Sequence, residues 1–327
     1  MRDPINDFEI PEEWIKRCKI PYDVLKEGIE NGKLILLPSG EILRRGYTTG
    51  TTAAAASKAA VLSLYTSDVI NRILVPTPIG IKVEFEVSSY NGKGVATKYA
   101  GDHEFDVTNG IEIVAHAYKS KLIKIIAGDG IGIKDNKPAI SPTAWNQIYS
   151  AISEALQITQ ENGAEVYLEV QNGAEIAKKT QNEKVGVIGG ISILGTTGFV
   201  EPWNDSMDKL INERIKNADK IVLTTGHLGM KYSRALFPDY TVIMVGSRLE
   251  KALHWTFDKE VIICGLPGLI LKSTNPDLLK RITVQELMQN SELIDTALAY
   301  LVKGAYPARV ILLNKDGSIL RDTKPNT

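Results

Sequence analysis

Cysteine is scarce in this sequence, with only Cys18 and Cys264 in 327 residues. The two lie far apart in unrelated patterns, so they offer neither a disulfide framework nor the paired spacing of a zinc site. An excess of basic residues is also absent, because 38 Lys and Arg face 39 Asp and Glu. The resulting net charge of −1 gives no indication of a nucleic-acid partner. The cysteine usage fits a reducing, cytoplasmic environment.

Long apolar runs are missing as well. No run of about 18 apolar residues occurs, so we expect no membrane-spanning helix. Residues 1–14 are acidic and polar and lack the apolar segment of a signal peptide. The chain has no P-loop, GxSxG elbow, HExxH helix or CxxC pair, which argues against a Walker-type NTPase and gives no sign of those hydrolase, metalloprotease or redox sites.

The most informative stretch is residues 43–60, LRRGYTTGTTAAAASKAA. Its alanines predict a helix, with Thr51 or Thr52 as the N-terminal cap. Free amide groups at a helix start, with Arg44 and Arg45 just upstream, suit a ligand that carries carboxylates or phosphates. The alternative is a small-residue helix packed against a sheet, preceded by two solvated arginines.

The first half of the chain predicts an α+β domain over residues 41–180, preceded by an extension over residues 1–40 with two short helices. The sequence predicts strands at 72–76, 81–87, 94–98, 111–118, 121–127 and 166–170, and helices at 142–159 and 173–179. Asn91-Gly92 predicts a tight hairpin between the second and third of these strands.

The second half changes character, because short apolar strands alternate with helices. The expected strands are 184–188, 221–225, 241–245, 261–264 and 309–313, and the expected helices are 206–217, 230–237, 248–257 and 276–303. Such strands, buried on both faces, predict a parallel sheet wound on both sides. Residues 181–327 are therefore expected to form a Rossmann-like, doubly wound α/β domain.

Ligands of doubly wound sheets bind at the carboxyl ends of the strands, and several predicted ends here are rich in glycine. The candidate ligand contacts at these ends are Gly189, Gly190, Gly195, Thr196, Thr197, Gly198, Gly226 and His227. Tight turns require glycine with or without a ligand, and a loop histidine is as readily satisfied by backbone. The GxGxxG fingerprint is absent, so a nicotinamide-dependent oxidoreductase is a weaker alternative for which dinucleotide binding should be negative.

An acidic segment, KYAGDHEFDVTNG, occupies residues 98–110. Asp102, Glu104 and Asp106 beside His103 are compatible with three interpretations: a metal cluster, a solvated acidic loop, or a carboxylate that handles a proton or a substrate group. No second ligand motif accompanies the segment, so we expect no metal bound by the protein itself.

Several of these segments together resemble one family. GYTTGTTAAAASKAA at 46–60 closely resembles the N-terminal signature of the CbiD family, the cobalt-precorrin-5B C(1)-methyltransferases of anaerobic cobalamin synthesis. AGDHEFDVT at 100–108 is similar to the family's acidic segment. GAEIAKKT at 173–180, VGVIGGISILGTTGFVEPW at 185–203 and TTGHLG at 224–229 resemble its central block and the turn that follows.

The resemblance implies transfer of a methyl group from S-adenosylmethionine to C1 of cobalt-precorrin-5B, which gives cobalt-precorrin-6A. The substrate is a carboxylated macrocycle that brings its own cobalt, and the product would pass to other enzymes of corrin synthesis. The implied substrate contacts are Arg44, Arg45, Thr48, Thr49, Gly50, Thr51 and Thr52. The glycine-rich strand ends would bind S-adenosylmethionine, and Asp102 or Asp106 is the candidate catalytic base.

Some positions depart from the family pattern. Thr52 stands where the family usually has cysteine, and GLPGL at 265–269 replaces a turn that usually contains histidine and lysine. These departures leave a second interpretation open, in which a diverged relative binds a tetrapyrrole or corrinoid without methylating C1.

Overall fold

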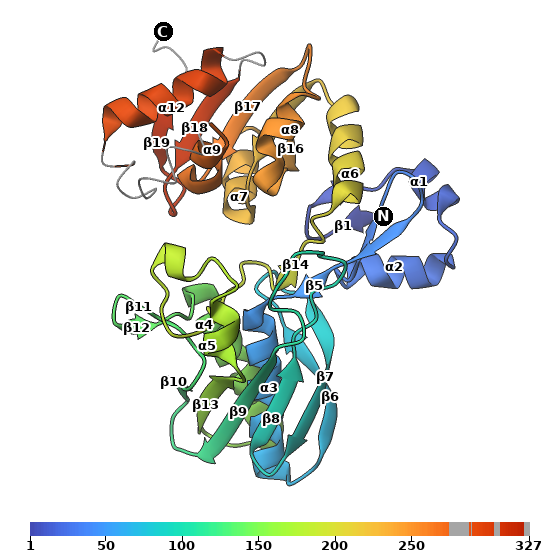
Figure 1. The fold of residues 1–327 in the computed structure, drawn as a ribbon. Coiled ribbons are helices and arrows are strands. Elements are labelled where there is room, and N and C mark those ends of the chain that lie inside the picture. The colour runs from blue at the N-terminus through green and yellow to red at the C-terminus, as the bar shows by residue number, and fades with distance from the viewer. Residues whose placement is uncertain (275–287, 289, 304–307, 324–327) are drawn as a thin grey trace. The chain divides into compact units, whose positions relative to one another are not determined.

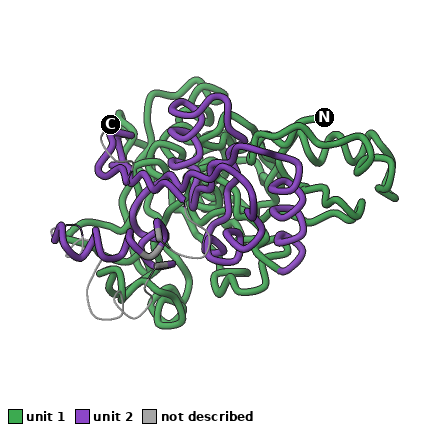
Figure 2. Tube along the Cα trace, turned by 90° about the horizontal axis from the view of Figure 1, so that it is seen from above, with its two compact units in different colours: residues 1–204 green, residues 205–327 purple. Residues whose placement is uncertain are grey.

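A computed structural model describes residues 1–274, 288, 290–303 and 308–323 of the chain. The chain forms two compact units, residues 1–204 and residues 205–327 (Figure 1, Figure 2). It is a mixed α/β protein in which each unit is built around its own sheet. The expected boundary at residues 180/181 therefore lies inside unit 1.

Unit 1 contains a six-stranded sheet in the order β10-β13-β9-β8-β7-β6. Its strands are β6 (Ile70–Pro76), β7 (Lys82–Tyr90), β8 (Lys93–Thr97), β9 (Glu112–Lys119), β10 (Lys124–Ala127) and β13 (Ala164–Val170). All neighbours are antiparallel except β10 and β13. The hairpin at Asn91-Gly92 is confirmed, and both residues have the positive φ, 46° and 81°, that a two-residue turn of this kind requires.

Helix α3 (Thr49–Thr66) is the centre of unit 1. It packs against strands β6 to β9 on one side and against α4 (Pro142–Thr159) on the other (Figure 1). Fifteen of its 18 residues are buried, as expected of a helix that is covered all round. The alternative for the alanine-rich stretch, a small-residue helix packed against a sheet, is therefore what the structure has, although only Arg44 of the two arginines is exposed and Arg45 is buried.

The alanines allow the backbone of α3 to lie almost directly on β8. A Cβ atom at Gly94 of β8 would lie 2.3 Å from the Ala56 carbonyl oxygen and 2.6 Å from the Ala60 nitrogen. Only glycine on the strand and alanine on the helix permit this approach. The contact explains why the pattern has neither a strong polar face nor large side chains.

The remaining elements of unit 1 lie around this core. The two helices expected in the N-terminal extension are confirmed as α1 (Glu12–Arg17) and α2 (Tyr22–Glu30). The short strands are β1 (Arg2–Asp3), β2 (Phe8–Glu9), β3 (Leu34–Leu36), β4 (Ile42–Arg44), β5 (Gly46–Tyr47), β11 (Ile133–Lys134), β12 (Lys137–Pro138) and β14 (Phe199–Val200), and the remaining helix is α5 (Gly173–Ala177).

The prediction of a strand at residues 184–188 is wrong. Residues Glu183–Val185 form a 3-10 helix, and the side chains of Val185 and Ile188 are exposed. The residues that follow pair with other segments of unit 1. Ile191 and Ile193 form isolated β-bridges with Ile131 and Ile140, and β14 pairs with β5. A short apolar run was thus mistaken for a buried strand of the second sheet.

Unit 2 contains a five-stranded sheet in the order β16-β15-β17-β18-β19. Its strands are β15 (Lys220–Thr224), β16 (Thr241–Met244), β17 (Glu260–Gly265), β18 (Arg309–Leu313) and β19 (Ile319–Asp322), and its helices are α6 (Asp205–Lys216), α7 (His227–Leu236), α8 (Leu249–Leu253), α9 (Pro267–Thr274) and α12 (Ser291–Lys303). The first four strands of this group are parallel, and β19 is antiparallel. The helix expected at 276–303 is described from residue 291 on; residues 276–287 lie outside the described residues.

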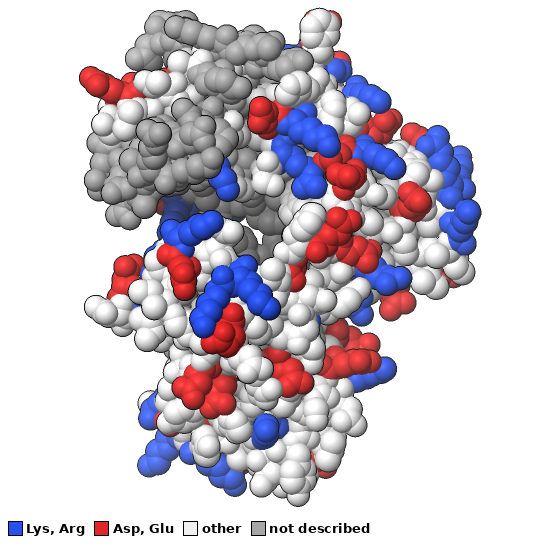
Figure 3. Space-filling model, in the orientation of Figure 1, with Lys and Arg blue, Asp and Glu red and all other residues white. Residues whose placement is uncertain are grey.

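The visible surface carries charges of both signs. In Figure 3, lysine and arginine side chains are interspersed with aspartate and glutamate on the face shown, in line with the balanced composition. In the part of the chain that the structure describes, no helix combines the length and apolar character needed to cross a membrane.

The close contact between α3 and β8 predicts the effect of one methyl group. Gly94→Ala should lower the free energy of unfolding by about 1–3 kcal/mol, because the added Cβ overlaps the helix backbone. Urea unfolding followed by circular dichroism measures this, with Ser88→Ala as a control on the exposed face of neighbouring β7. Equal urea midpoints for the two variants would contradict the packing described here.

Candidate functional site

The start of α3 is capped by Thr48, not by Thr51 or Thr52 as predicted. The Thr48 side chain accepts a hydrogen bond from the Thr51 amide at 3.2 Å. The Thr52 amide and hydroxyl both donate to the Thr48 carbonyl at 3.0 Å. Both predicted caps therefore lie within the first helical turn, where their hydroxyl groups are buried.

Several hydrogen-bonding groups at the helix start are already bonded within the chain. The Gly50 amide donates to the Leu194 carbonyl at 3.0 Å. The Thr49 hydroxyl donates to the Ser192 carbonyl at 2.9 Å and accepts from the Leu194 amide at 2.9 Å. Because these groups are satisfied within the chain, the expected carboxylate site at the helix N-terminus is not supported.

Residues 192–198 form the segment that closes it. A Cβ atom at Gly195 would lie 2.3 Å from the Thr48 hydroxyl oxygen, and the Gly198 carbonyl accepts from the Thr51 hydroxyl at 2.8 Å. Thr197 is buried and bonds to the backbone of Phe199, directly after this segment. The structure thus brings predicted substrate contacts at the helix start next to the predicted cofactor contacts Gly195 and Gly198. The two glycines, however, allow the segment to pack closely on α3.

The other glycine-rich residues of this region differ among themselves. Gly190 is buried, and a Cβ there would lie 2.4 Å from the Gly130 carbonyl oxygen, so it too serves close packing. Gly189 and Thr196 are exposed. Because the expected strand at 184–188 is absent, Gly189 and Gly190 do not follow a strand end of the second sheet.

Arg45 lies inside unit 1 and is part of its core. Its side chain is fully buried and forms ion pairs with Asp3 at 2.6 Å and with Glu201 at 3.0 Å. Burial alone would lower the pKa of Arg45, but the two carboxylates outweigh burial and raise it overall. Burial raises the pKa of Glu201, which Arg45 offsets only in part. The expected contact between Arg45 and a substrate is therefore not supported, since its charge is already paired with two carboxylates inside the protein.

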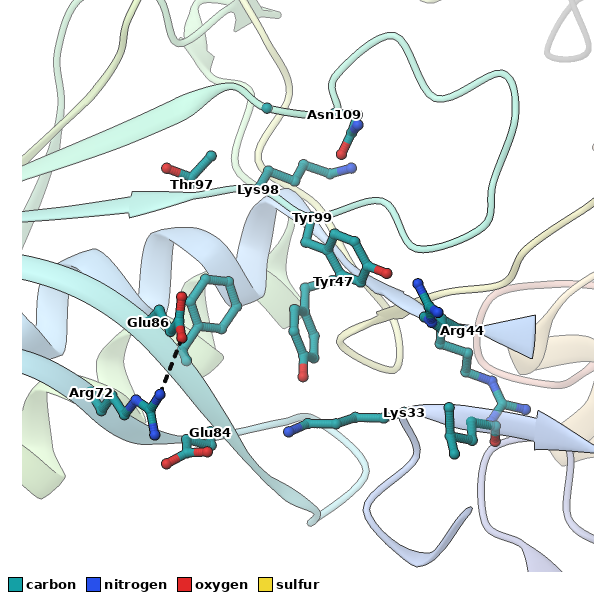
Figure 4. A pocket seen from close by; sticks show the side chains of 14 residues that line it. Lys33, Arg44, Tyr47, Arg72, Glu84, Glu86, Thr97, Lys98, Tyr99 and Asn109 are labelled. Carbon is teal, nitrogen blue, oxygen red and sulfur yellow. Dashed lines mark hydrogen bonds and ion pairs between the residues drawn. The ribbon is translucent and has the colours of Figure 1, made fainter. Parts of the chain in front are cut away.

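The neighbouring Arg44 is exposed and faces a pocket of about 720 Å³ (Figure 4). Lys33, Tyr47 and Tyr99 also line this pocket, and sequence reasoning missed all three. Their only signal was their position in the sequence, since Tyr47 lies within the family-like signature and Tyr99 lies within the acidic segment at 98–110. Burial, with Tyr99 and Glu84 nearby, raises the pKa of Tyr47, so its hydroxyl stays protonated at neutral pH.

The two candidate bases occupy different environments. Asp106 forms an ion pair with Lys98 at 2.5 Å and accepts from the amide and hydroxyl of Thr108. Burial opposes ionisation of Asp106, but Lys98 and Thr108 outweigh it and lower the pKa. Asp102 is half-buried, and its Oδ2 accepts from the Arg44 amide at 2.8 Å. Asp106 also lines a second pocket of about 400 Å³ with Thr48, Thr49 and His103.

The interpretation of the acidic segment as a metal site has no geometric support within the described residues. Among these, no three His, Cys, Asp or Glu side chains converge in a way that could hold a metal ion. The carboxylates of this segment instead bond to the backbone of Arg44 and to Lys98.

In unit 2, the carboxyl ends of β15 and β17 are adjacent, because the two strands are parallel neighbours. Strand order reverses at this point, since β16 lies on one side of β15 and β17 on the other. Gly226 follows β15 with open space around it, and His227 begins α7. The Thr224 hydroxyl is buried without a hydrogen-bond partner among the described residues. Crevices at such reversals are the usual ligand sites of parallel sheets.

Comparison with known proteins identifies the family. The CbiD family model matches residues 37–202, which span the α3 helix, the acidic segment and residues 192–198 that close the helix start. The chain belongs to the CbiD family. Two relatives named cobalt-precorrin-5B C(1)-methyltransferase extend the match over both units. The protein from Methanosarcina acetivorans is 45% identical over 99% of each chain, and that from Methanococcoides burtonii is 47% identical over 98% of each.

A solved CbiD structure supports the fold. The crystal structure of a cobalamin biosynthesis protein (cbiD) from Archaeoglobus fulgidus matches with a TM-score of 0.75 and 40% sequence identity. The match covers 84% of this chain and 92% of that one. The CbiD resemblance seen in the sequence motifs is confirmed, and the similarity continues beyond Gly229, where the motifs become less regular.

The buried ion pairs of Arg45 predict a large loss of stability. Arg45→Ala should lower the free energy of unfolding by about 3–5 kcal/mol, because Asp3 and Glu201 would stay buried without a partner. Arg44→Ala, one residue earlier and exposed, should change it by less than about 0.5 kcal/mol. Thermal and urea unfolding of both variants measure the difference. Similar losses would show that Arg45 is not the buried centre described here.

Proposed function

We propose that this protein methylates cobalt-precorrin-5B at C1, with S-adenosylmethionine as methyl donor, to give cobalt-precorrin-6A in cobalamin biosynthesis. The observation that carries the proposal is the near full-length similarity, at 45–47% identity, to proteins named for this activity. The diverged, non-methylating relative is the second candidate, since it rests on the departures at Thr52 and at residues 265–269.

The position of Thr52 weakens that second candidate. Thr52 is fully buried, and its hydroxyl donates to the Thr48 carbonyl within the helix. A threonine in place of the cysteine expected there therefore faces the protein interior rather than a ligand. The similarity to the Methanosarcina acetivorans protein also spans 99% of both chains, so residues 265–269 lie within the matched length.

For the methyl donor, we propose the carboxyl ends of β15 and β17 as the binding region. S-adenosylmethionine carries its transferable methyl group on a positively charged sulfonium. The residues there fit such a ligand, because Gly226 is surrounded by open space and the buried Thr224 hydroxyl is unpaired among the described residues. Gly226, His227 and Thr224 would contact the donor, in a Rossmann-like unit 2. The exposed Gly189 and Thr196 remain further candidates.

If a proton leaves during the reaction, Asp102 is the better candidate base. The pKa of Asp106 is lowered by its partners, and a carboxylate held so firmly by Lys98 and Thr108 is a weaker proton acceptor. Asp102 has a single backbone partner and is half-buried. The cobalt arrives with the substrate, so the reaction requires no metal site of the protein.

We further propose that the enzyme works in the cytoplasm and passes its product to another enzyme of corrin synthesis. Both cysteines are free thiols, and Cys264 is buried. Unpaired thiols of this kind are typical of reducing compartments.

Anaerobic incubation with cobalt-precorrin-5B and S-adenosylmethionine tests the activity. We expect a gain of one methyl at C1, located by mass spectrometry and NMR, and a donor with a deuterated methyl should carry its label into the product. Omission of the donor is the control. A corrinoid that binds but gains no methyl in any preparation would favour the non-methylating relative.

The proposed donor region predicts the effect of a side chain at Gly226. Gly226→Val should preserve the fold, since the residue has extended backbone angles and open space around it. It should weaken S-adenosylmethionine binding by about tenfold or more through overlap with the ligand, as measured by calorimetry without corrinoid. Ala235→Val, exposed near the other end of α7, is the matched control. Unchanged donor affinity in Gly226→Val would place the donor elsewhere.

A further inference from the structure

The pocket beside Arg44 has the properties of a site for a large, flat, anionic molecule. It lies wholly within unit 1, between the β3–β4 hairpin, strands β6 to β8 and the segment that follows β8. Its volume of about 720 Å³ falls within the range of roughly 300–1,000 Å³ that is usual for small-molecule sites. We name it the tyrosine pocket, after Tyr47 and Tyr99, which line it (Figure 4).

Two of its positive charges are free for a ligand. Neither the Lys33 amine nor the Arg44 guanidinium has an ion pair or side-chain hydrogen bond within the described part of the chain. The other cations of the pocket are engaged: Arg72 pairs with Glu86, Lys98 with Asp106, and Arg45 with buried carboxylates. Free cations that line a pocket are suited to carboxylates at the edge of a ligand.

The walls of the tyrosine pocket also offer aromatic surface. Tyr99 is 43% exposed, although a large aromatic side chain gains free energy from being covered. Tyr47 packs against Phe85 with ring centroids 4.9 Å apart, and its hydroxyl points into the pocket (Figure 4). An exposed ring beside free cations matches a macrocycle that is apolar on its faces and carboxylated at its edge.

Resting on the proposed function, we infer that the tyrosine pocket is the binding site of the corrinoid substrate. Lys33 and Arg44 pair with its peripheral carboxylates, and Tyr99 packs against the face of the ring. Glu84 also lines the pocket, on the side toward which the Lys33 amine extends in Figure 4, and has no ion pair among the described residues, so it disfavours a carboxylate next to it and orients the ring. Recognition therefore depends on the charge of the periphery, which a corrinoid with amidated or esterified side chains lacks.

Binding of two defined corrinoids tests the inference. Cobyrinic acid carries free carboxylates, and its fully methyl-esterified form has the same ring with a neutral periphery. The double variant Lys33→Gln/Arg44→Gln should bind cobyrinic acid about tenfold or more weakly than the wild type, because charge-assisted contacts are lost. Its affinity for the ester should stay within about twofold, because the ester makes no such contact. Titrations followed by protein fluorescence give both affinities.

A matched control removes the same charge elsewhere in unit 1. Lys93→Gln/Lys121→Gln alters two exposed lysines at the opposite end of β8 and β9, and it should bind both corrinoids like the wild type. Tyr99→Ala should weaken both corrinoids alike, whereas Tyr99→Phe should weaken neither. Equal loss of cobyrinic acid binding in the two double variants, or full binding in Lys33→Gln/Arg44→Gln, would overturn the inference.

The same proteins separate this inference from the proposed function. A wild type that methylates cobalt-precorrin-5B, with unchanged corrinoid binding in the Lys33→Gln/Arg44→Gln variant, would reject the pocket and keep the function. A wild type that does not methylate, but discriminates the acid from the ester through Lys33 and Arg44, would reject the function and keep the pocket.

Discussion

The close approach of α3 to β8 is the constraint on which the rest of unit 1 depends. Gly94 and the alanines bring two backbones into contact, and this fixes how closely the helix lies on the sheet. Residues 192–198 then close the helix start, because the carbonyls of Leu194 and Gly198 accept its donors. The closing segment in turn carries β14 onto β5 and brings Glu201 to Arg45. A stretch with almost no large side chains thereby positions parts of the chain that are distant in sequence.

Much of the fold could be predicted from local signals. Helix α4 has the predicted bounds, 142–159, because Ser141 caps it and Pro142 fits its first turn. The Asn91-Gly92 hairpin is likewise encoded by residues that tolerate positive φ. The strand expected at 184–188 failed because a short apolar run does not reveal whether a sheet is available to pair with it. Here the sheet of unit 2 begins later, at β15.

The site was harder to predict than the fold, because one residue type serves ligands and packing equally well. Gly195 and Gly198 have the composition of a ligand-binding loop, yet their neighbours are Thr48 and Thr51. Arg44 and Arg45 are adjacent in sequence, but the alternation of side chains along the chain exposes the first and buries the second. Arg45 is paired in the interior with Asp3 and Glu201, which are distant from it in sequence, so no local sequence pattern indicates these partners.

That separation has a consequence for biogenesis. Asp3 and Arg45 both precede Glu201 in the chain, and Glu201 follows Arg45 after a separation of 156 residues. The nascent chain therefore carries an incompletely neutralised cation at its future centre until almost all of unit 1 has been translated. Local helices and hairpins can form during this interval, but the final closure of unit 1 must wait for its last segment. The buried charge cluster is complete only when both ends of unit 1 are present.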